Sequence, residues 1–180
     1  MTEGLRFFGE RRIATTSFLG IVRRHYLVSQ GRSARREIIR HPGAVAVVPV
    51  IEGDVVLISQ YRVAIDRHLL EIPAGKCDAP GEDPESTAIR ECEEEVGFRP
   101  HRLTLLRTFF TTPGFTDEVI RLYLAEDLEP VKSRPHGIEE ERAAVVRMPI
   151  EEAMRRVRDG DIVDAKTLIG LMAIEKERSA

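Results

Sequence analysis

The stretch EIPAGKCDAPGEDPESTAIRECEEEVGF, residues 71–98, decides how the rest of the chain is interpreted. It begins as a glycine-containing loop and continues as a helix. Asp83 is a good N-cap, Pro84 suits the first helical position, and Gly97 is a typical C-terminal stop. The helix is therefore predicted to start at Pro84 and to end before Gly97. Its predicted core-facing residues are Ala88, Ile89, Cys92 and Val96.

Three glutamates crowd the last turns of this helix. Spacings of three and four residues place Glu91, Glu94 and Glu95 on one helical face. Like charges in such an arrangement destabilise a helix by roughly a few tenths of a kcal/mol per pair unless a partner compensates. A divalent cation is the simplest such partner, and a solvated acidic face is the plain alternative.

Composition bounds the class of protein. The chain has 180 residues, of which 32% are charged and 42% hydrophobic. That balance is typical of a soluble globular protein, and the length suits one domain with a short appendage. The net charge of −3 argues against a protein that binds nucleic acid through bulk positive charge.

Cysteine usage and hydropathy indicate where the protein works. The two cysteines, Cys77 and Cys92, imply no disulfide framework. No apolar run is long enough for a membrane span, and the N-terminus lacks the apolar core of a signal peptide. A cytoplasmic location, with no membrane partner, is the resulting expectation.

Residues 1–40 contain too few apolar residues in a regular pattern to form a core alone. Strand-like pieces at residues 5–8 and 18–28 predict a small N-terminal β segment. We expect it to pack on the main domain or on a second subunit. Its many arginines make it locally basic, which suits an anionic small molecule.

Residues 41–180 are predicted to form the main domain. The apolar, β-branched run 44–51 indicates a strand buried on both faces, with residues 55–62 as its hairpin partner. The order of the remaining elements predicts an α/β or α+β sandwich with a mixed sheet between helices. Those elements are strands at 103–110, 119–125 and 143–148, and helices at 150–157 and 164–177. The last helix is predicted to bury an apolar stripe of Leu168, Leu171, Met172 and Ile174.

Residues 75–98 resemble the Nudix box, Gly-x5-Glu-x7-Arg-Glu-U-x-Glu-Glu-x-Gly-U, in which U is apolar. Glu82 and the run from Arg90 to Phe98 satisfy the pattern. One spacing departs from it, because six residues lie between Gly75 and Glu82. Since loop closure depends weakly on length, the extra residue affects the loop's contacts and not the helix. The resemblance also implies that Arg90 and Glu82 brace the loop against the helix.

The resemblance implies a Nudix-type α/β/α sandwich and metal-dependent hydrolysis of a nucleoside diphosphate linked to another group. Glu91 and Glu95 would ligate Mg²⁺ or Mn²⁺, which prefer hard oxygen donors. Glu94 would be a third ligand or the general base, and the carbonyl of Ala74 a further ligand. Cations held there would neutralise the pyrophosphate and lower the pKa of the attacking water.

Segments outside the box look like the ADP-ribose pyrophosphatase branch of the family. They are residues 60–62, 70–75 and 112–118. In that branch a proline follows the second glycine of the box by sixteen residues, and Pro113 follows Gly97 by sixteen. The implied reaction converts ADP-ribose to AMP and ribose 5-phosphate. The alternatives are another nucleotide-sugar substrate, such as GDP-mannose, and a non-catalytic module that binds ADP-ribose.

Substrate-binding residues are also suggested by this resemblance. Arg62 would bind a phosphate or the terminal ribose, since its guanidinium suits bidentate contacts; a surface arginine at a strand end is the alternative. Glu118 would bind a ribose hydroxyl, and Gly114 lies in the Pro-Gly loop expected to meet the substrate.

An acidic residue on a late loop completes the metal site or acts as base in that branch. Counting back from the predicted strand at 143–148 favours Glu141, with Glu139 the next choice. An ordinary charged loop is the alternative.

Proteins of this kind are commonly homodimers that exchange N-terminal segments and complete the adenine pocket. That role would involve Arg36 and the aromatic residues Phe18 and Tyr26, and a core role is the alternative for the two aromatics.

Overall fold

The computed structural model describes residues 5–28, 31–78, 81–134 and 142–178. It divides the chain into two compact units. The first unit comprises residues 1–43 and 110–119, and the second comprises residues 44–109 and 120–180. Each unit has its own sheet.

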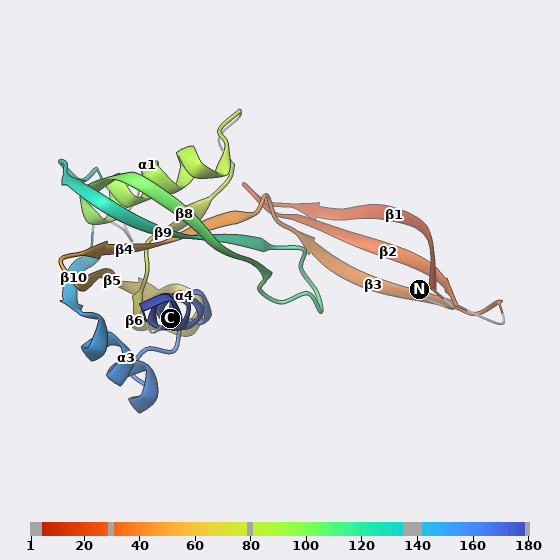
Figure 1. The fold of residues 1–180 in the computed structure, drawn as a ribbon. Helices are drawn as coiled ribbons and strands as arrows, with labels where there is room; N and C mark the ends of the chain where they lie inside the picture. Colours follow the sequence, from red (N-terminus) through yellow and green to blue (C-terminus); the bar gives the residue numbers. More distant parts are fainter. Residues whose placement is uncertain (1–4, 29–30, 79–80, 135–141, 179–180) are drawn as a thin grey trace. The chain divides into compact units, whose positions relative to one another are not determined.

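The first unit is built on a three-stranded antiparallel sheet in the order β1-β2-β3, coloured red to orange in Figure 1. Its strands are β1 Leu5–Thr15, β2 Gly20–Val28 and β3 Ser33–Arg40. The small N-terminal sheet predicted from the sequence is present, although the first strand is longer than expected and the second begins two residues later. β3 was not predicted, because its charged residues interrupt the apolar alternation that indicates a strand.

Burial in the first unit is slight. Val22 is 3% exposed and is the one buried apolar side chain among the described residues of this unit. Leu5, Phe7 and Phe8 of β1 are exposed. This sheet therefore has two largely solvated faces within the single chain, which is unusual for strands carrying large apolar residues.

The loop 110–119 belongs to the first unit through its contacts with β3. The Ile39 amide donates to the Phe115 carbonyl at 2.8 Å, and the Asp117 amide donates to the Ile39 carbonyl at 3.3 Å. Arg40 Nη1 donates to Asp117 Oδ2 at 2.6 Å. The Pro-Gly loop is thus held along the end of the small sheet.

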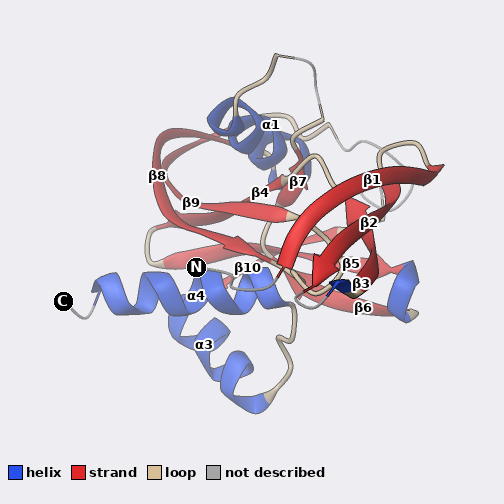
Figure 2. Ribbon diagram, turned by 90° about the vertical axis from the view of Figure 1, so that its right-hand side faces the viewer, coloured by secondary structure: helices blue, strands red, loops and turns tan. Residues whose placement is uncertain are grey.

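The second unit contains a seven-stranded mixed sheet in the order β10-β5-β4-β9-β8, with β6 beside β5 and β7 beside β4 (Figure 2). β4 pairs in parallel with β9 and antiparallel with β5, which confirms the predicted mixed sheet and hairpin. A short 3-10 helix follows β5 at Val63–Ile65. The strands are β4 Ala44–Ile51, β5 Asp54–Arg62, β6 Arg67–Glu71, β7 Ala74–Lys76, β8 Phe98–Phe110, β9 Val119–Pro130 and β10 Ala144–Pro149.

β4 is buried on both faces, as its sequence predicts. Ala46 and Val48 belong to one apolar cluster, and Val45 and Val47 belong to the other. Helix α1 (Pro84–Val96) packs on the second cluster, whereas α3 (Ile150–Asp159) and α4 (Ala165–Arg178) pack on the first. Figure 2 shows these helices on opposite sides of the sheet, so the predicted α/β/α sandwich is confirmed.

The helix ends follow local signals, but one side chain of α4 was predicted wrongly. Leu171 and Ile174 are buried, whereas Met172 is 59% exposed. Successive helical residues are rotated by about 100°, which turns Met172 off the face that meets the sheet. On that face a Cβ added to Gly170 would lie 2.8 Å from Val48 Cγ2, so α4 lies close against β4.

Within the described part of the chain, no helix combines the length and apolar character needed to cross a bilayer.

Candidate active site

Helix α1 is anchored at both ends by the residues that predict it. Asp83 Oδ1 accepts hydrogen bonds from the amides of Glu85 and Ser86 at 2.9 and 3.0 Å. Gly97 adopts a φ of 73°, a left-handed conformation that favours glycine. Of the residues expected to face the core, Ile89 is half-buried and the others are buried: Ala88, Cys92 and Val96.

Arg90 braces the loop against the helix, as the sequence predicts. Its Nε and Nη2 lie 3.1 Å from the carboxylate oxygens of Glu82. Its Nη1 also contacts Glu91 at 2.7 Å and Glu94 at 3.0 Å, which was not expected. The hydrogen bonds to Glu82 are the main reason that the pKa of Arg90 is raised. One guanidinium is therefore shared among three carboxylates.

Two of the predicted metal ligands meet the same short piece of backbone. Glu91 is 6% exposed, and a Cβ added to Gly75 would lie 1.9 Å from its Oε1. Glu95 Oε2 accepts a hydrogen bond from the Ala74 amide at 2.9 Å. β7 holds this backbone in place by pairing with β4, Ala74 opposite Ala46. A larger residue at position 75 would require the Glu91 carboxylate to move.

The donor set has the chemistry of a site for a hard divalent cation. It consists of carboxylate oxygens placed beside the half-buried backbone of residues 74 and 75, and it contains no thiol or imidazole. Within residues 5–28, 31–78, 81–134 and 142–178, no three His, Cys, Asp or Glu side chains are gathered closely enough to hold an ion. Arg90 bonds Glu91 and Glu94 instead, so a cation would share these carboxylates with Arg90.

Arg62 lies at the end of β5 and pairs with a buried carboxylate, that of Glu71, which was not among the predicted site residues. Its Nε and Nη2 each lie 2.6 Å from an oxygen of Glu71. Lys166 Nζ, from the first turn of α4, bonds the same carboxylate and lies 3.1 Å from Asp164 Oδ2. Burial raises the pKa of Glu71, but the hydrogen bonds and charges of Arg62 and Lys166 outweigh it and lower the pKa overall.

The other predicted substrate residues belong to the first unit. Glu118 Oε2 accepts from Thr111 Oγ1 at 2.6 Å, and Oε1 lies 3.5 Å from His41 Nε2. Gly114 is exposed in the loop, and Arg36 is exposed on β3. Glu139 and Glu141 lie outside the described residues. The structure thus groups Ala74, Glu91, Glu94, Glu95 and Arg62 in one unit, and Arg36, Gly114 and Glu118 in the other.

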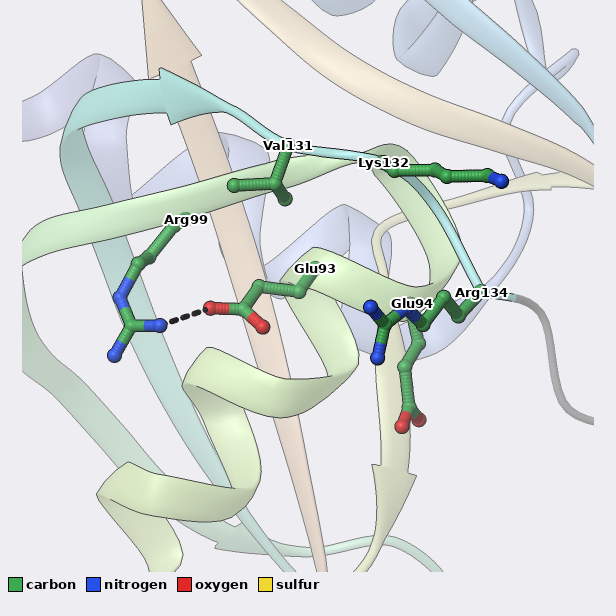
Figure 3. A pocket seen from close by; sticks show the side chains of 6 residues that line it. All are labelled: Glu93, Glu94, Arg99, Val131, Lys132 and Arg134. Atoms are coloured by element: carbon green, nitrogen blue, oxygen red, sulfur yellow. Dashed lines mark ion pairs between the residues drawn. The ribbon is translucent and has the colours of Figure 1, made fainter.

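A cavity of about 300 Å³ opens at the C-terminal end of α1 (Figure 3). Arg99 Nη1 lies 3.0 Å from Glu93 Oε1 on one side of it, and Glu94 lies on the other side, near Arg134. The Ser133 hydroxyl donates to the Glu94 carbonyl at 2.6 Å, and this bond holds Ser133, which follows β9, against the C-terminal end of α1. The cavity is lined by Glu93, Glu94, Arg99, Val131, Lys132 and Arg134.

Comparison with known proteins finds a family, several relatives and a solved structure that resemble this chain. The model of the NUDIX domain matches residues 40–168. An ADP-ribose pyrophosphatase of Bacillus subtilis is 40% identical over 146 residues, 81% of this chain and 78% of that protein. An ADP-ribose pyrophosphatase of Mycobacterium tuberculosis is 41% identical over 146 residues, 80% of this chain and 70% of that protein. A crystal structure of an ADP compounds hydrolase superposes with a TM-score of 0.84 at 25% identity, covering 98% of this chain and 95% of the other.

Proposed function

The chain belongs to the Nudix family, and from this premise we propose that it hydrolyses the pyrophosphate of ADP-ribose, with a divalent cation, to AMP and ribose 5-phosphate. The observation that carries the proposal is the meeting of Glu91 and Glu95 with the backbone at Ala74 and Gly75. This contact places carboxylate oxygens from a rigid helix close to the backbone of residues 74–75. That arrangement suits a metal-assisted attack on phosphorus.

The residues proposed to hold Mg²⁺ or Mn²⁺ are Glu91, Glu94, Glu95 and the carbonyl of Ala74. A cation bound there would supply charge neutralisation on the pyrophosphate oxygens and would acidify the attacking water. Helix α1 supports the assignment because its caps and buried face hold all three glutamates in fixed register. Glu94 is also a candidate for the general base, together with Glu141 and then Glu139.

Substrate contacts are proposed for Arg62, Arg36, Glu118 and Gly114. Arg62 is the best supported of these, because a guanidinium that is half-exposed at a strand end can bond a phosphate bidentately. The relatives named ADP-ribose pyrophosphatase support the choice of substrate.

The protein is proposed to act as a cytoplasmic homodimer. The support lies in the first unit, whose sheet exposes large apolar residues that a second copy of the chain would cover. The exposed residues are Leu5, Phe7, Phe8, Ile13 and Leu27. Light scattering at several concentrations tests the idea, and a mass that stays at one chain throughout would contradict it.

A substrate panel tests the activity. Initial rates with Mg²⁺ are compared for ADP-ribose, GDP-mannose, NADH and dinucleoside polyphosphates. We expect ADP-ribose to give the highest kcat/KM, with AMP and ribose 5-phosphate as products. A higher value for GDP-mannose would reassign the substrate, whereas tight binding of ADP-ribose without product would indicate a non-catalytic module.

A further inference from the structure

Arg62 meets Glu71 with one edge of its guanidinium group. Nε and Nη2 form that edge, each 2.6 Å from a carboxylate oxygen. A guanidinium carries five N–H donors, so Nη1 and the second hydrogen of Nη2 form another edge. Glu71 is 1% exposed, whereas the Arg62 side chain is 40% exposed. The bonded edge faces a buried carboxylate, so the edge formed by Nη1 and Nη2 is the one left for a ligand.

The first turn of α4 also bonds Glu71, at the Oε2 atom that accepts from Arg62 Nη2. Lys166 bonds the Glu71 carboxylate, and the Ile72 amide donates to Thr167 Oγ1 at 2.9 Å. Asp164 fixes this turn, because its Oδ2 accepts from the Thr167 hydroxyl at 2.6 Å and from the Thr167 amide at 3.0 Å. The chain runs from Ile72 directly to the backbone at residues 74–75, so α4 also anchors the segment that faces the acidic helix.

The charges of this cluster are balanced. Glu71 and Asp164 supply two carboxylates, and Arg62 and Lys166 supply two cations. If Lys166 were absent, Arg62 would be the one remaining cation of the set, and the set would carry a net negative charge. The Glu71 carboxylate would then be held by Arg62 alone. Lys166 also occupies one oxygen of Glu71, which limits the positions that the carboxylate can take.

The acidic helix lies within electrostatic reach of the cluster. The pKa of Arg62 is raised chiefly by its hydrogen bonds to Glu71, and the charge of Glu95 adds to the effect. Glu71 therefore orients Arg62 by hydrogen bonds, while the charge of Glu95 in the candidate metal site also acts on the same guanidinium.

We infer that Lys166 and Glu71 are positioning residues: Lys166 holds the Glu71 carboxylate, and Glu71 fixes Arg62 so that its outer edge is presented to a phosphate of the substrate. The inference deepens the proposed function and rests on it for the identity of the substrate. Lys166 itself touches no reacting atom in this arrangement; its effect passes through Glu71 and Arg62.

A double-mutant cycle tests this chain of contacts. Lys166→Met is expected to raise KM for ADP-ribose by about tenfold and to change kcat by less than about twofold, since the lost interaction serves binding. In the Arg62→Ala background, the same substitution is expected to change KM by less than about twofold, because residues acting through one another are not additive. Lys166→Arg should restore most of the loss. An equal effect of Lys166→Met in both backgrounds would overturn the inference.

A parallel cycle separates this inference from the proposed activity. The dissociation constant of inorganic pyrophosphate with Mn²⁺ is measured by calorimetry for the same four proteins, which requires no turnover. No hydrolysis combined with a non-additive pyrophosphate cycle would refute the activity and support the inference. Hydrolysis with two additive cycles would refute the inference alone, and neither hydrolysis nor pyrophosphate binding would refute both. Glu71→Gln, which preserves the shape of the side chain, replaces Lys166→Met if that variant does not fold.

Discussion

The second unit holds two groups of carboxylates that are stabilised in opposite ways. At α1, Glu82 of the preceding loop and Glu91 and Glu94 of the helix share one guanidinium, that of Arg90. At the end of β6, the single carboxylate of Glu71 is bonded by two cations, Arg62 and Lys166. In the first group, three carboxylates share one cation, so the group carries excess negative charge. In the second group, the negative and positive charges are equal once Asp164 is included.

This difference distinguishes a group that can bind a further cation from a group whose role is to position a charged side chain. A group in which carboxylates share one cation retains affinity for a further cation. A balanced and buried group gains nothing from an added ion, and its parts are held by their mutual hydrogen bonds. We therefore expect substitutions on α1 to act on metal-dependent turnover, and substitutions around Glu71 to act on stability and substrate binding.

The largest effect is expected from the acidic helix. Glu94→Gln and Glu95→Gln should each lower kcat by at least about a hundredfold, because metal-assisted catalysis is lost. Steady-state rates on ADP-ribose with saturating Mg²⁺ provide the measurement. Glu93→Gln is the matched control, since Glu93 lies on the same helix but pairs with Arg99 at 3.0 Å, and it should retain near-normal turnover. Near-normal rates in the first two variants would remove these carboxylates from the mechanism.

A smaller effect, on stability, is expected at Glu71. Glu71→Gln leaves Lys166 and Arg62 without their carboxylate, and we expect the free energy of unfolding to fall by about 2 kcal/mol, since Arg62 is partly screened by solvent. The pKa of Glu71 is lowered from its ordinary 4.5, because the contacts of Arg62 and Lys166 outweigh the burial that raises it. A carboxylate with a lowered pKa stabilises the fold above its unfolded pKa, and the contribution disappears as pH falls through the folded value.

Chemical denaturation at several pH values checks both statements about Glu71. The difference between wild type and Glu71→Gln should be constant near neutral pH and should shrink as pH falls below 4.5. A difference that widened in acid would mean that burial, and not the two cations, dominates the carboxylate.

Gly75→Ala should lower kcat/KM by about tenfold, which corresponds to about 1.4 kcal/mol. The added Cβ would lie 1.9 Å from Glu91 Oε1, so the carboxylate would have to move away from the loop. Gly9→Ala is the control, because nothing lies within 4 Å of a Cβ at that position. An unchanged kcat/KM in Gly75→Ala would show that the close approach of Glu91 to the loop has no part in the reaction.

The smallest effect is expected at Arg90. Arg90→Gln should destabilise the metal-free protein by up to about 1 kcal/mol, the range of partly exposed ion pairs. Mn²⁺ should recover most of that loss, since a cation can replace the guanidinium among the glutamates. Thermal unfolding with and without Mn²⁺ is the measurement. Arg155→Gln on α3 removes a comparable exposed pair with Glu152, and its stability should not respond to Mn²⁺. An equal response of both variants would argue against a cation at α1.

Sequence reasoning succeeded where a structure is specified by neighbouring residues. Asp83, Pro84 and Gly97 each act within one turn of the helix end, so the bounds of α1 follow from them directly. The burial of β4 on both faces follows from a continuous apolar run. The contact of Arg90 with Glu82 was implied by the family pattern and is confirmed.

Other features depend on partners distant in sequence and could not be predicted. The bond between Lys166 and Glu71 joins residues 95 positions apart, and no local pattern indicates that the two side chains meet. Strand β3 carries Arg35, Arg36 and Glu37, which conceal its pairing with β2.

The late position of Lys166 has a consequence for biosynthesis. Glu71 and Arg62 are synthesised long before Lys166, the second cation that bonds the Glu71 carboxylate, because 95 positions separate Glu71 from Lys166. Until then the nascent chain must keep this carboxylate hydrated, since burying it with incomplete partners is unfavourable. The contacts of Glu71 and Ile72 with Lys166 and Thr167 therefore form only after the first turn of α4 is synthesised. The same holds for the final position of the loop at residues 74–75. The candidate metal site is therefore completed only after the first turn of α4 is made, some seventy residues after the glutamates of α1.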